Sequence, residues 1–470
     1  MRADLENLAP NGLLGCVALQ EVSAVLQKKP IGYWNPRTEL MPREKLEDLQ
    51  VRRLRVMVAW AQERSPLWQR KLNAAGVKPD DIRTLEDIQA IPFLTKSEIL
   101  DSQQEHPPFG DIFTGECADL GVAYHQTSGT SGRAPLRVFE TARGWNWGAD
   151  TWATGLYAFG VRRQDVVYFA FGYGPFQGFW GAHYAFQKIG ATTIPGGAQT
   201  SENRIRQIIE LGATVVAATP SYAIRLAQIA EGMGINLATD SKVEMLLLAG
   251  EPGANVPATK AMIERAWGAH GGDFAGMTES SGLTTFECSE KPGGMHINDA
   301  NFIEEVVDPI ANKWLEYGQR GERISTSFGK GVIPLLRYRT GDLVEKTPGS
   351  RCACGRTWDI YNGGIIGRVD DMKLIRGTNV FPSAIEGVVR KHDEIHEFQI
   401  VLHKVTYIDE ITVRLDPKPD VSGAEWPRLM QELTKELAEA HEGLRFNVEM
   451  ATPGELPTFE HKAKRLVDRR

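Results

Sequence analysis

The sequence predicts an α/β protein with two parts. The first is a large N-terminal domain of parallel-rich sheets flanked by helices, and the second is a small α+β domain at the C-terminus. The chain has 470 residues, more than one hydrophobic core usually organises. Short apolar runs alternate with helical segments over residues 121–342, which is typical of parallel strands covered on both faces. After about residue 370 the pattern changes to alternating strands and an amphipathic helix.

Composition and charge narrow the class of protein. Hydrophobic content of 42% and charged content of 24% are typical of a soluble globular chain. A net charge of −7 argues against nucleic acid as a partner, and without an apolar run of about 18 residues we expect no membrane span. The first six residues lack the pattern of a secretory signal, and five cysteines do not form a disulfide framework. We therefore expect a cytoplasmic protein.

The elements follow in order along the chain. An amphipathic helix is expected over 46–61, interrupted at Ser65-Pro66, and Thr95 and Glu98 have the spacing of a helix capping box. A further helix is expected through 183–189, after the first of four apolar strands. These strands are expected at 166–171, 191–195, 215–220 and 245–250. Their carboxyl ends meet at one edge in a parallel sheet, where ligands collect. Polar or glycine-rich turns at 172–176, 219–222, 249–253 and 276–280 are expected at that edge.

The stretch 125–135 is rich in hydroxyls and glycines and carries one guanidinium. Glycines expose successive backbone N–H groups that form an anion-binding concavity, and Arg133 can pair with phosphate oxygens. The loop does not fit the Walker pattern, because no Gly-Lys-Ser/Thr follows at the required spacing. A polar surface turn is the alternative. The residues expected to grip phosphate are Thr127, Ser128, Gly129, Thr130, Ser131, Gly132 and Arg133.

Two further stretches carry acidic groups. A polar loop over 274–282 places Glu279 beside hydroxyls, where a carboxylate oxygen can hold Mg²⁺ against phosphates. A lone glutamate in a loop is more often simply solvated. A strand over 335–344 ends in Gly341-Asp342, and an acid at a strand end suits the two hydroxyls of a ribose. Glycines and paired charges over 363–373 indicate a hinge, so we place the domain boundary near Asp370, between 1–369 and 370–470.

The C-terminal part is expected to hold strands at 398–402 and 411–415 and an amphipathic helix at 430–441. Its tail, residues 457–466, is basic. A basic terminus is usually only solvated, so this tail alone indicates little.

In this order, the motifs resemble those of the adenylate-forming superfamily of acyl-CoA synthetases, most closely its phenylacetate-CoA ligase group. The resemblance runs from about residue 30 to the C-terminus. Residues 127–135 look like the family's phosphate loop, Met277-Thr278-Glu279 matches its Thr/Ser-Glu motif, and 338–342 matches its ribose motif. Residues 367–371 look like its hinge, 376–382 are similar to a run typical of the group, and 462–465 look like its terminal Lys-Ala-Lys-Arg.

The resemblance implies a two-step reaction with ATP, Mg²⁺ and coenzyme A. A carboxylate would attack the α-phosphate of ATP to give an acyl-adenylate and pyrophosphate. The small domain would then rotate as a mobile lid about Asp370, and the thiol of coenzyme A would displace AMP. Lys462, Glu279 and Thr130 would be catalytic. Besides the phosphate loop, the implied nucleotide contacts are Gly250, Glu251, Pro252, Ala275, Gly276, Met277, Thr278, Asp342 and Arg368.

Three residues depart from the family pattern. Arg133 stands where the family usually has lysine, which keeps the charge but changes the donor geometry. Ala275 replaces the aromatic residue that commonly stacks on adenine. His461 stands where glycine is frequent. These departures concern kinetic detail and leave the reaction class unchanged.

Cys288, His296, Cys352 and Cys354 form a candidate Cys₃His zinc set drawn from two distant segments. The Cys-x-Cys spacing is tighter than the usual two-residue gap, so unrelated buried thiols are the alternative. Some members of the group carry a similar arrangement, which favours a structural zinc ion.

Aromatic side chains cluster in and after the turn that follows residue 171. Their density favours a flat aryl or arylacetic acid over a long fatty acid, although core packing is the alternative for each residue. Tyr124 and His125 precede the phosphate loop and are placed near the carboxylate. The expected pocket residues are Phe171, Tyr173, Phe176, Phe179, Trp180 and His183.

Two other functions remain as alternatives. An adenylating ligase could pass the acyl group to an amine or a carrier protein. A nucleotide-binding regulator without catalysis would be expected to lack the equivalents of Glu279, Asp342 or Lys462, and all three are present. The group often forms dimers, so a homodimer stays open.

Overall fold

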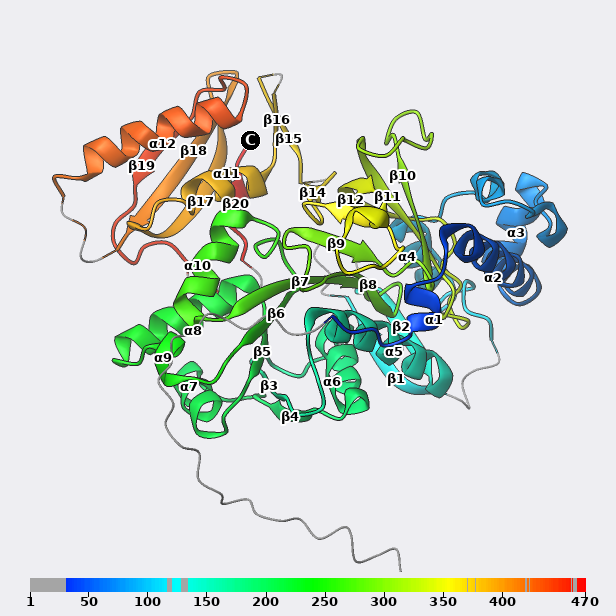
Figure 1. The fold of residues 1–470 in the computed structure, drawn as a ribbon. Coiled ribbons are helices and arrows are strands. Elements are labelled where there is room, and N and C mark those ends of the chain that lie inside the picture. The colour runs from blue at the N-terminus through cyan, green and yellow to red at the C-terminus, as the bar shows by residue number, and fades with distance from the viewer. Residues whose placement is uncertain are drawn as a thin grey trace, which may run out of the picture.

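The computed structural model describes residues 31–115, 121–127, 134–369, 371–376, 378–418, 421, 423–457, 459 and 463–470. A 12-stranded sheet forms the large body, and a separate four-stranded sheet forms the C-terminal part (Figure 1). Among the described residues, no helix combines the length and the apolar composition that a membrane crossing requires.

One half of the large sheet is parallel, as expected. Its strands are β3 (Val166–Phe169), β4 (Thr192–Pro195), β5 (Val215–Ala218), β6 (Met245–Ala249) and β7 (His270–Met277), in the order β4-β3-β5-β6-β7. Helices α7 (Ser201–Glu210), α8 (Pro220–Gly232) and α10 (Pro257–Trp267) share one core with this sheet, and α9 (Leu237–Asp240) lies beside α10. On the other face are α5 (Ala142–Phe159) and α6 (Gln177–Ile189). The carboxyl ends of β3, β5, β6 and β7 therefore share one edge.

The other half of the sheet is antiparallel, which the sequence did not predict. It contains β8 (Gly282–Glu287), β9 (Gly294–Ile297), β13 (Ile360–Asn362), β12 (Tyr338–Thr347), β11 (Arg320–Ser327) and β10 (Phe302–Val307). Residues 278–281 are too few for a parallel crossover, so β8 must reverse against β7. The predicted loop 274–282 is correspondingly too long, because Phe274–Met277 belongs to β7.

The N-terminal part is helical, as predicted. It contains α1 (Pro36–Glu39), α2 (Arg43–Arg64), α3 (Pro66–Ala75), α4 (Lys96–Glu105) and the short helices η1 (Pro79–Asp81) and η2 (Glu86–Ala90). The predicted break at Ser65-Pro66 separates α2 from α3, and Thr95 and Glu98 form a capping box at the start of α4. A hairpin of β1 (Gly121–Gln126) and β2 (Arg137–Thr141) follows.

The C-terminal part is α+β, as predicted. Its sheet has the order β19 (Asn447–Met450), β18 (Ile408–Pro417), β17 (Ile395–Val405) and β20 (Leu466–Asp468). Helices α11 (Pro382–Val389) and α12 (Trp426–Ala440) pack on it, and β15 (Lys373–Ile375) pairs with β16 (Thr378–Val380). The short elements η4 (Gly349–Arg351) and β14 (Gly367–Arg368) precede this part. Figure 1 shows α11 and the C-terminal end above α10 of the large body.

Candidate active site

The hairpin β1–β2 holds the two ends of the expected phosphate loop together. The backbone N–H of Thr127 donates to the carbonyl of Leu136 at 2.9 Å, and the Leu136 N–H donates to the Thr127 hydroxyl at 3.1 Å. The Gln126 N–H donates to the carbonyl of Pro175 in the turn after β3, at 2.8 Å. The base of the loop therefore lies at the carboxyl edge of the parallel strands.

Several predicted residues lie outside the described part of the chain. They are Ser128, Gly129, Thr130, Ser131, Gly132 and Arg133 of the loop, Asp370 of the hinge, and His461 and Lys462 of the tail. Their roles stay predictions.

Glu279 lies in the turn between β7 and β8 and is almost fully buried. The hydroxyl of Tyr338 donates to Glu279 Oε1 at 3.1 Å, and Lys96 Nζ lies 3.4 Å from the same oxygen. Burial, with the neighbouring Glu279 carboxylate, raises the pKa of Tyr338 well above its ordinary value, so this hydroxyl keeps its proton and acts as a donor. Glu279 is thus a fixed carboxylate, and not the solvated side chain of the alternative interpretation.

Lys330 supports the same turn, and sequence reasoning missed it. Its side chain is fully buried, its ammonium donates to the carbonyl of Thr278 at 3.0 Å, and it lies 3.3 Å from Glu140 Oε1. Burial lowers the pKa of Lys330, while the Glu140 carboxylate opposes that shift. Glu140 on β2 also accepts the hydroxyl of Ser281. A lysine between two glycines was the only sequence signal, and it does not reveal these partners.

Asp342 lies inside β12 and not at a strand end, which corrects the prediction. The strand continues because Asp342 pairs with Arg368 of β14 and its neighbour Leu343 pairs with β11. The carboxylate lies between two guanidinium groups, 3.3 Å from Arg323 Nη1 and 3.3 Å from Arg368 Nη1. Burial raises the pKa of Asp342, and the two arginines oppose that shift.

The turn after β6 holds Gly250, Glu251 and Pro252. Gly250 has a φ of +97°, which a residue with a side chain rarely adopts. Glu251 Oε1 accepts the Ser221 N–H at the start of α8 at 2.8 Å, and Glu251 Oε2 accepts the Ala463 N–H of the C-terminal tail at 2.6 Å. Ala275, Gly276 and Met277 form the adjacent end of β7, which precedes Thr278. Three of the predicted nucleotide segments therefore gather at one sheet edge: the base of the phosphate loop, the turn after β6 and the end of β7.

Most of the predicted acyl-pocket residues form one aromatic cluster. Phe171 stacks on Phe179 with ring centroids 4.1 Å apart, and Tyr173 meets Trp180 edge-on at 4.7 Å. The Tyr173 hydroxyl lies 2.9 Å from His183 Nδ1. Burial raises the pKa of Tyr173 and lowers that of His183, so both are neutral near pH 7.

The other three predicted acyl-pocket residues lie outside this set of direct ring contacts. Tyr124 contacts Phe109, and Phe176 is 53% exposed. His125 stacks on Trp145 at 5.0 Å, and Trp145 in turn meets Tyr184 edge-on. Burial lowers the pKa of His125 to about 4, so its imidazole is neutral at physiological pH.

The predicted Cys₃His residues come together although two of them follow the others by more than 50 residues. One ligand atom from each of Cys288, His296, Cys352 and Cys354 lies within 4.8 Å of the other three, and all four residues are buried. The Cys288 and Cys352 sulfurs are 3.6 Å apart, and the Cys354 sulfur is 3.3 Å from His296 Nε2. His296 Nδ1 lies 3.2 Å from the carbonyl of Trp358, which leaves Nε2 free for a metal. These separations fit tetrahedral zinc with bonds of about 2.0–2.3 Å.

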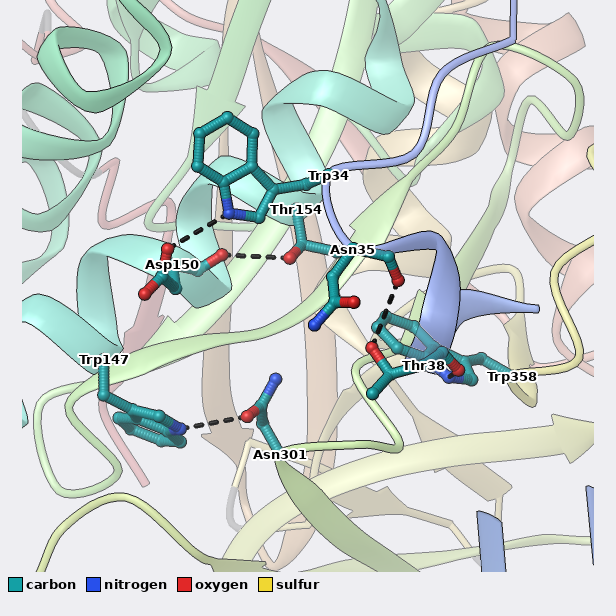
Figure 2. Close-up of a pocket in the computed structure, with 8 residues that line it drawn as sticks. All are labelled: Trp34, Asn35, Thr38, Trp147, Asp150, Thr154, Asn301 and Trp358. Carbon is teal, nitrogen blue, oxygen red and sulfur yellow. Dashed lines mark hydrogen bonds between the residues drawn. The ribbon is translucent and has the colours of Figure 1, made fainter. Parts of the chain in front are cut away.

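A cavity of about 440 Å³ lies elsewhere, between α1, α5 and the segment around Trp358 (Figure 2). Three of its lining residues are tryptophans. Each indole N–H donates within the lining: Trp34 to Asp150 at 3.1 Å, Trp147 to Asn301 at 2.9 Å, and Trp358 to the carbonyl of Thr38 at 3.0 Å. None of its eight lining residues was predicted as a site residue. They are Trp34, Asn35, Thr38, Trp147, Asp150, Thr154, Asn301 and Trp358.

Residues 377–470 match the family described as the AMP-binding enzyme C-terminal domain. The phenylacetate-coenzyme A ligase of Thermus thermophilus is 33% identical over 458 residues, which cover 93% of this chain and 99% of that protein. The ligase of the same name from Pseudomonas putida is 32% identical over 430 residues, which cover 90% of this chain and 94% of that protein.

Among solved structures, 2-hydroxyisobutyryl-CoA ligase in its postadenylation state with R3-HIB-AMP matches with a TM-score of 0.88. The two chains are 30% identical, over 93% of this chain and 92% of that chain. The same ligase with 2-HIB-AMP and CoA in its thioesterification state matches with a TM-score of 0.70. The two chains are 31% identical, over 93% of this chain and 92% of that chain.

Proposed function

The chain belongs to the phenylacetate-coenzyme A ligase family, and we propose that it activates an aromatic carboxylic acid with ATP and transfers the acyl group to coenzyme A. The acid is of the phenylacetate or benzoate type. AMP and pyrophosphate are the other products.

One observation carries this proposal: strand β12 positions both acidic groups of the nucleotide site. Tyr338 on β12 holds Glu279, and Asp342 follows four residues later in the same strand, where β12 bulges against β11 and Gly341 has a φ of +74°. One bulged stretch of β12 therefore carries Asp342 and fixes Glu279. This placement suits a nucleotide whose ribose hydroxyls meet Asp342 while its phosphates and their magnesium ion meet Glu279.

The reaction brings two anions together, so the first step depends on positive charge and fixed donors. An oxygen of the acid attacks the α-phosphorus, the bond to the bridging oxygen breaks, and pyrophosphate leaves. We assign the positive charge to Arg133 of the phosphate loop and to Lys462, and a donated hydrogen bond to the Thr130 hydroxyl. Glu279 would hold a Mg²⁺ ion, which would neutralise further phosphate charge. The thiol of coenzyme A then forms the thioester bond as AMP departs with the oxygen that came from the acid.

The acyl group is assigned to the aromatic cluster around Phe171, Tyr173 and Phe179. A neutral His125 can donate a hydrogen bond to the carboxylate without neutralising the attacking oxygen. Tyr124, Phe176 and His183 complete the proposed pocket. Residues 370–470 form the proposed lid, with Asp370 as its hinge. A cytoplasmic location stays a prediction.

Zinc is assigned to Cys288, His296, Cys352 and Cys354. With four protein ligands the site is closed, so the ion would be structural and would tie the segment after β8 to the segment before β13. It would not supply a nucleophile.

A substrate screen tests the proposed function. AMP release is measured for phenylacetate, benzoate, their substituted relatives and 2-hydroxyisobutyrate, each with and without coenzyme A. We expect AMP and a CoA thioester in equal amounts with at least one aromatic acid. Exchange of pyrophosphate without thioester would indicate an amine or carrier-protein acceptor. Turnover of 2-hydroxyisobutyrate alone would contradict the aromatic assignment.

A further inference from the structure

Several polar contacts join the C-terminal part to the large body, among them a buried hydrogen bond at α10 and a partly buried one at Glu251. Thr259 on α10 donates its hydroxyl to Glu386 Oε1 on α11 at 3.0 Å, and both residues are buried. The Ala463 N–H donates to Glu251 Oε2 at 2.6 Å. A third contact, between Arg265 and Asp393, is exposed and therefore worth little energetically.

Glu251 joins three segments at this seam. Its second carboxylate oxygen accepts the Ser221 N–H at 2.8 Å, so one side chain links the turn after β6, the start of α8 and the C-terminal tail. A backbone N–H that donates to a carboxylate makes a stronger hydrogen bond than two neutral groups would. Removal of that acceptor would leave the Ala463 N–H without this strong partner.

The tail is fixed on its other side by Arg465. Its guanidinium binds Glu397 through two hydrogen bonds, of 2.8 and 3.1 Å, and lies 3.9 Å from Glu386. The short segment 463–465 therefore connects the C-terminal sheet to Glu251, and Lys462 immediately precedes it in the sequence.

The arrangement of the two parts matches one state of the related ligase better than another. The TM-score is 0.88 for its postadenylation state and 0.70 for its thioesterification state, with equal coverage of this chain. The seam through Glu251 thus belongs to an arrangement closer to the postadenylation state than to the thioesterification state.

We propose that Glu251 is a positioning residue that docks the segment after Lys462 for acid activation and releases it for thioester formation. The inference rests on the proposed function, in which Lys462 serves only the first step. It assigns the Glu251 side chain to the seam between the domains and not to the nucleotide. The docked or released state of the tail at Glu251 would thereby determine whether the lid is positioned for acid activation or for thioester formation.

Glu251→Gln tests this assignment because an amide has only one acceptor oxygen for the two N–H groups. We expect the rate constant of acid-dependent ATP–pyrophosphate exchange to fall about 10- to 100-fold, as for loss of a hydrogen bond to a charged group. Thioester formation from preformed acyl-adenylate and the KM for ATP should stay within about twofold. A raised KM for ATP, or equal loss in both half-reactions, would overturn the assignment.

Two further variants at the same seam serve as a second test and a control. Thr259→Val removes the buried contact between α10 and α11 and should lower the exchange rate selectively in the same way. Arg265→Gln removes the exposed contact of the same seam and should leave both half-reactions within about twofold.

A readout without turnover separates this inference from the proposed function. Docking should protect the tail from trypsin, so Glu251→Gln should speed cleavage after Lys462 or Lys464 about tenfold, and Arg265→Gln should not. Unchanged cleavage would refute the docking even if the enzyme is active. Faster cleavage in a protein that activates no acid would refute the proposed function alone.

Discussion

Replacement of Lys330 by methionine should destabilise the protein far more than a typical surface substitution. The ammonium is fully buried, 3.3 Å from a Glu140 carboxylate that is equally buried. Methionine fills similar space but leaves that carboxylate without its counter-charge, which typically costs about 3–5 kcal/mol. The carbonyl of Thr278 also loses its donor, so we expect Glu279 to shift and acid-dependent AMP release to fall about tenfold.

The double variant Lys330→Met, Glu140→Gln isolates the charge effect. It removes the uncompensated carboxylate and should recover about 2 kcal/mol of the loss, because a neutral amide is far cheaper to bury. Urea unfolding of the wild type, both single variants and the double variant, followed by tryptophan fluorescence, gives the coupling between the two sites. A loss under about 1 kcal/mol for Lys330→Met, with no recovery in the double variant, would refute the reasoning.

Three further predictions address the metal, the pH dependence and the lid. Purified protein should contain one zinc ion per chain, and zinc-free wild type would contradict the proposed site. Cys354→Ser should abolish zinc binding and lower the melting temperature by roughly 3–10 °C. The pKa of His125 is about 4 when folded, against about 6.5 unfolded, so stability from this residue is lost as pH falls from 6.5 to 4. The urea midpoint of the wild type should therefore fall between pH 7 and pH 5. His125→Phe keeps a ring against Trp145 and should make this fall smaller, and an equal fall in the variant would contradict the prediction. Lys462→Ala should slow adenylation far more than thioester formation from preformed adenylate, and equal slowing would exclude that role.

The sequence predicted the parallel half of the sheet well, because buried strands of Val, Leu and Ala between helices have few other solutions. It predicted the strand at 335–344, where β12 lies, but not the antiparallel pairing of β8 to β13, because no run of residues shows that a chain reverses instead of crossing over. Asp342 was recognised, but its place inside β12 depends on a two-residue partner strand around Arg368 that no periodicity reveals.

Contacts between distant segments were the least predictable part of the site. Lys330 meets Glu140 across 190 positions of sequence, and its functional context exists only after folding. Glu251 was expected to contact the nucleotide, whereas its carboxylate bonds to Ser221 and Ala463 depend on how two separate sheets pack. The Cys₃His set, by contrast, was found because cysteine and histidine are rare enough to stand out.

The most direct test of the central claim follows one oxygen atom. If the acid forms an acyl-adenylate, phenylacetate labelled with ¹⁸O in its carboxylate should transfer one labelled oxygen to AMP in each turnover. Mass spectrometry of the AMP measures this transfer. We predict one ¹⁸O per AMP, together with the CoA thioester. Unlabelled AMP, or label in a product other than AMP and the thioester, would contradict the account.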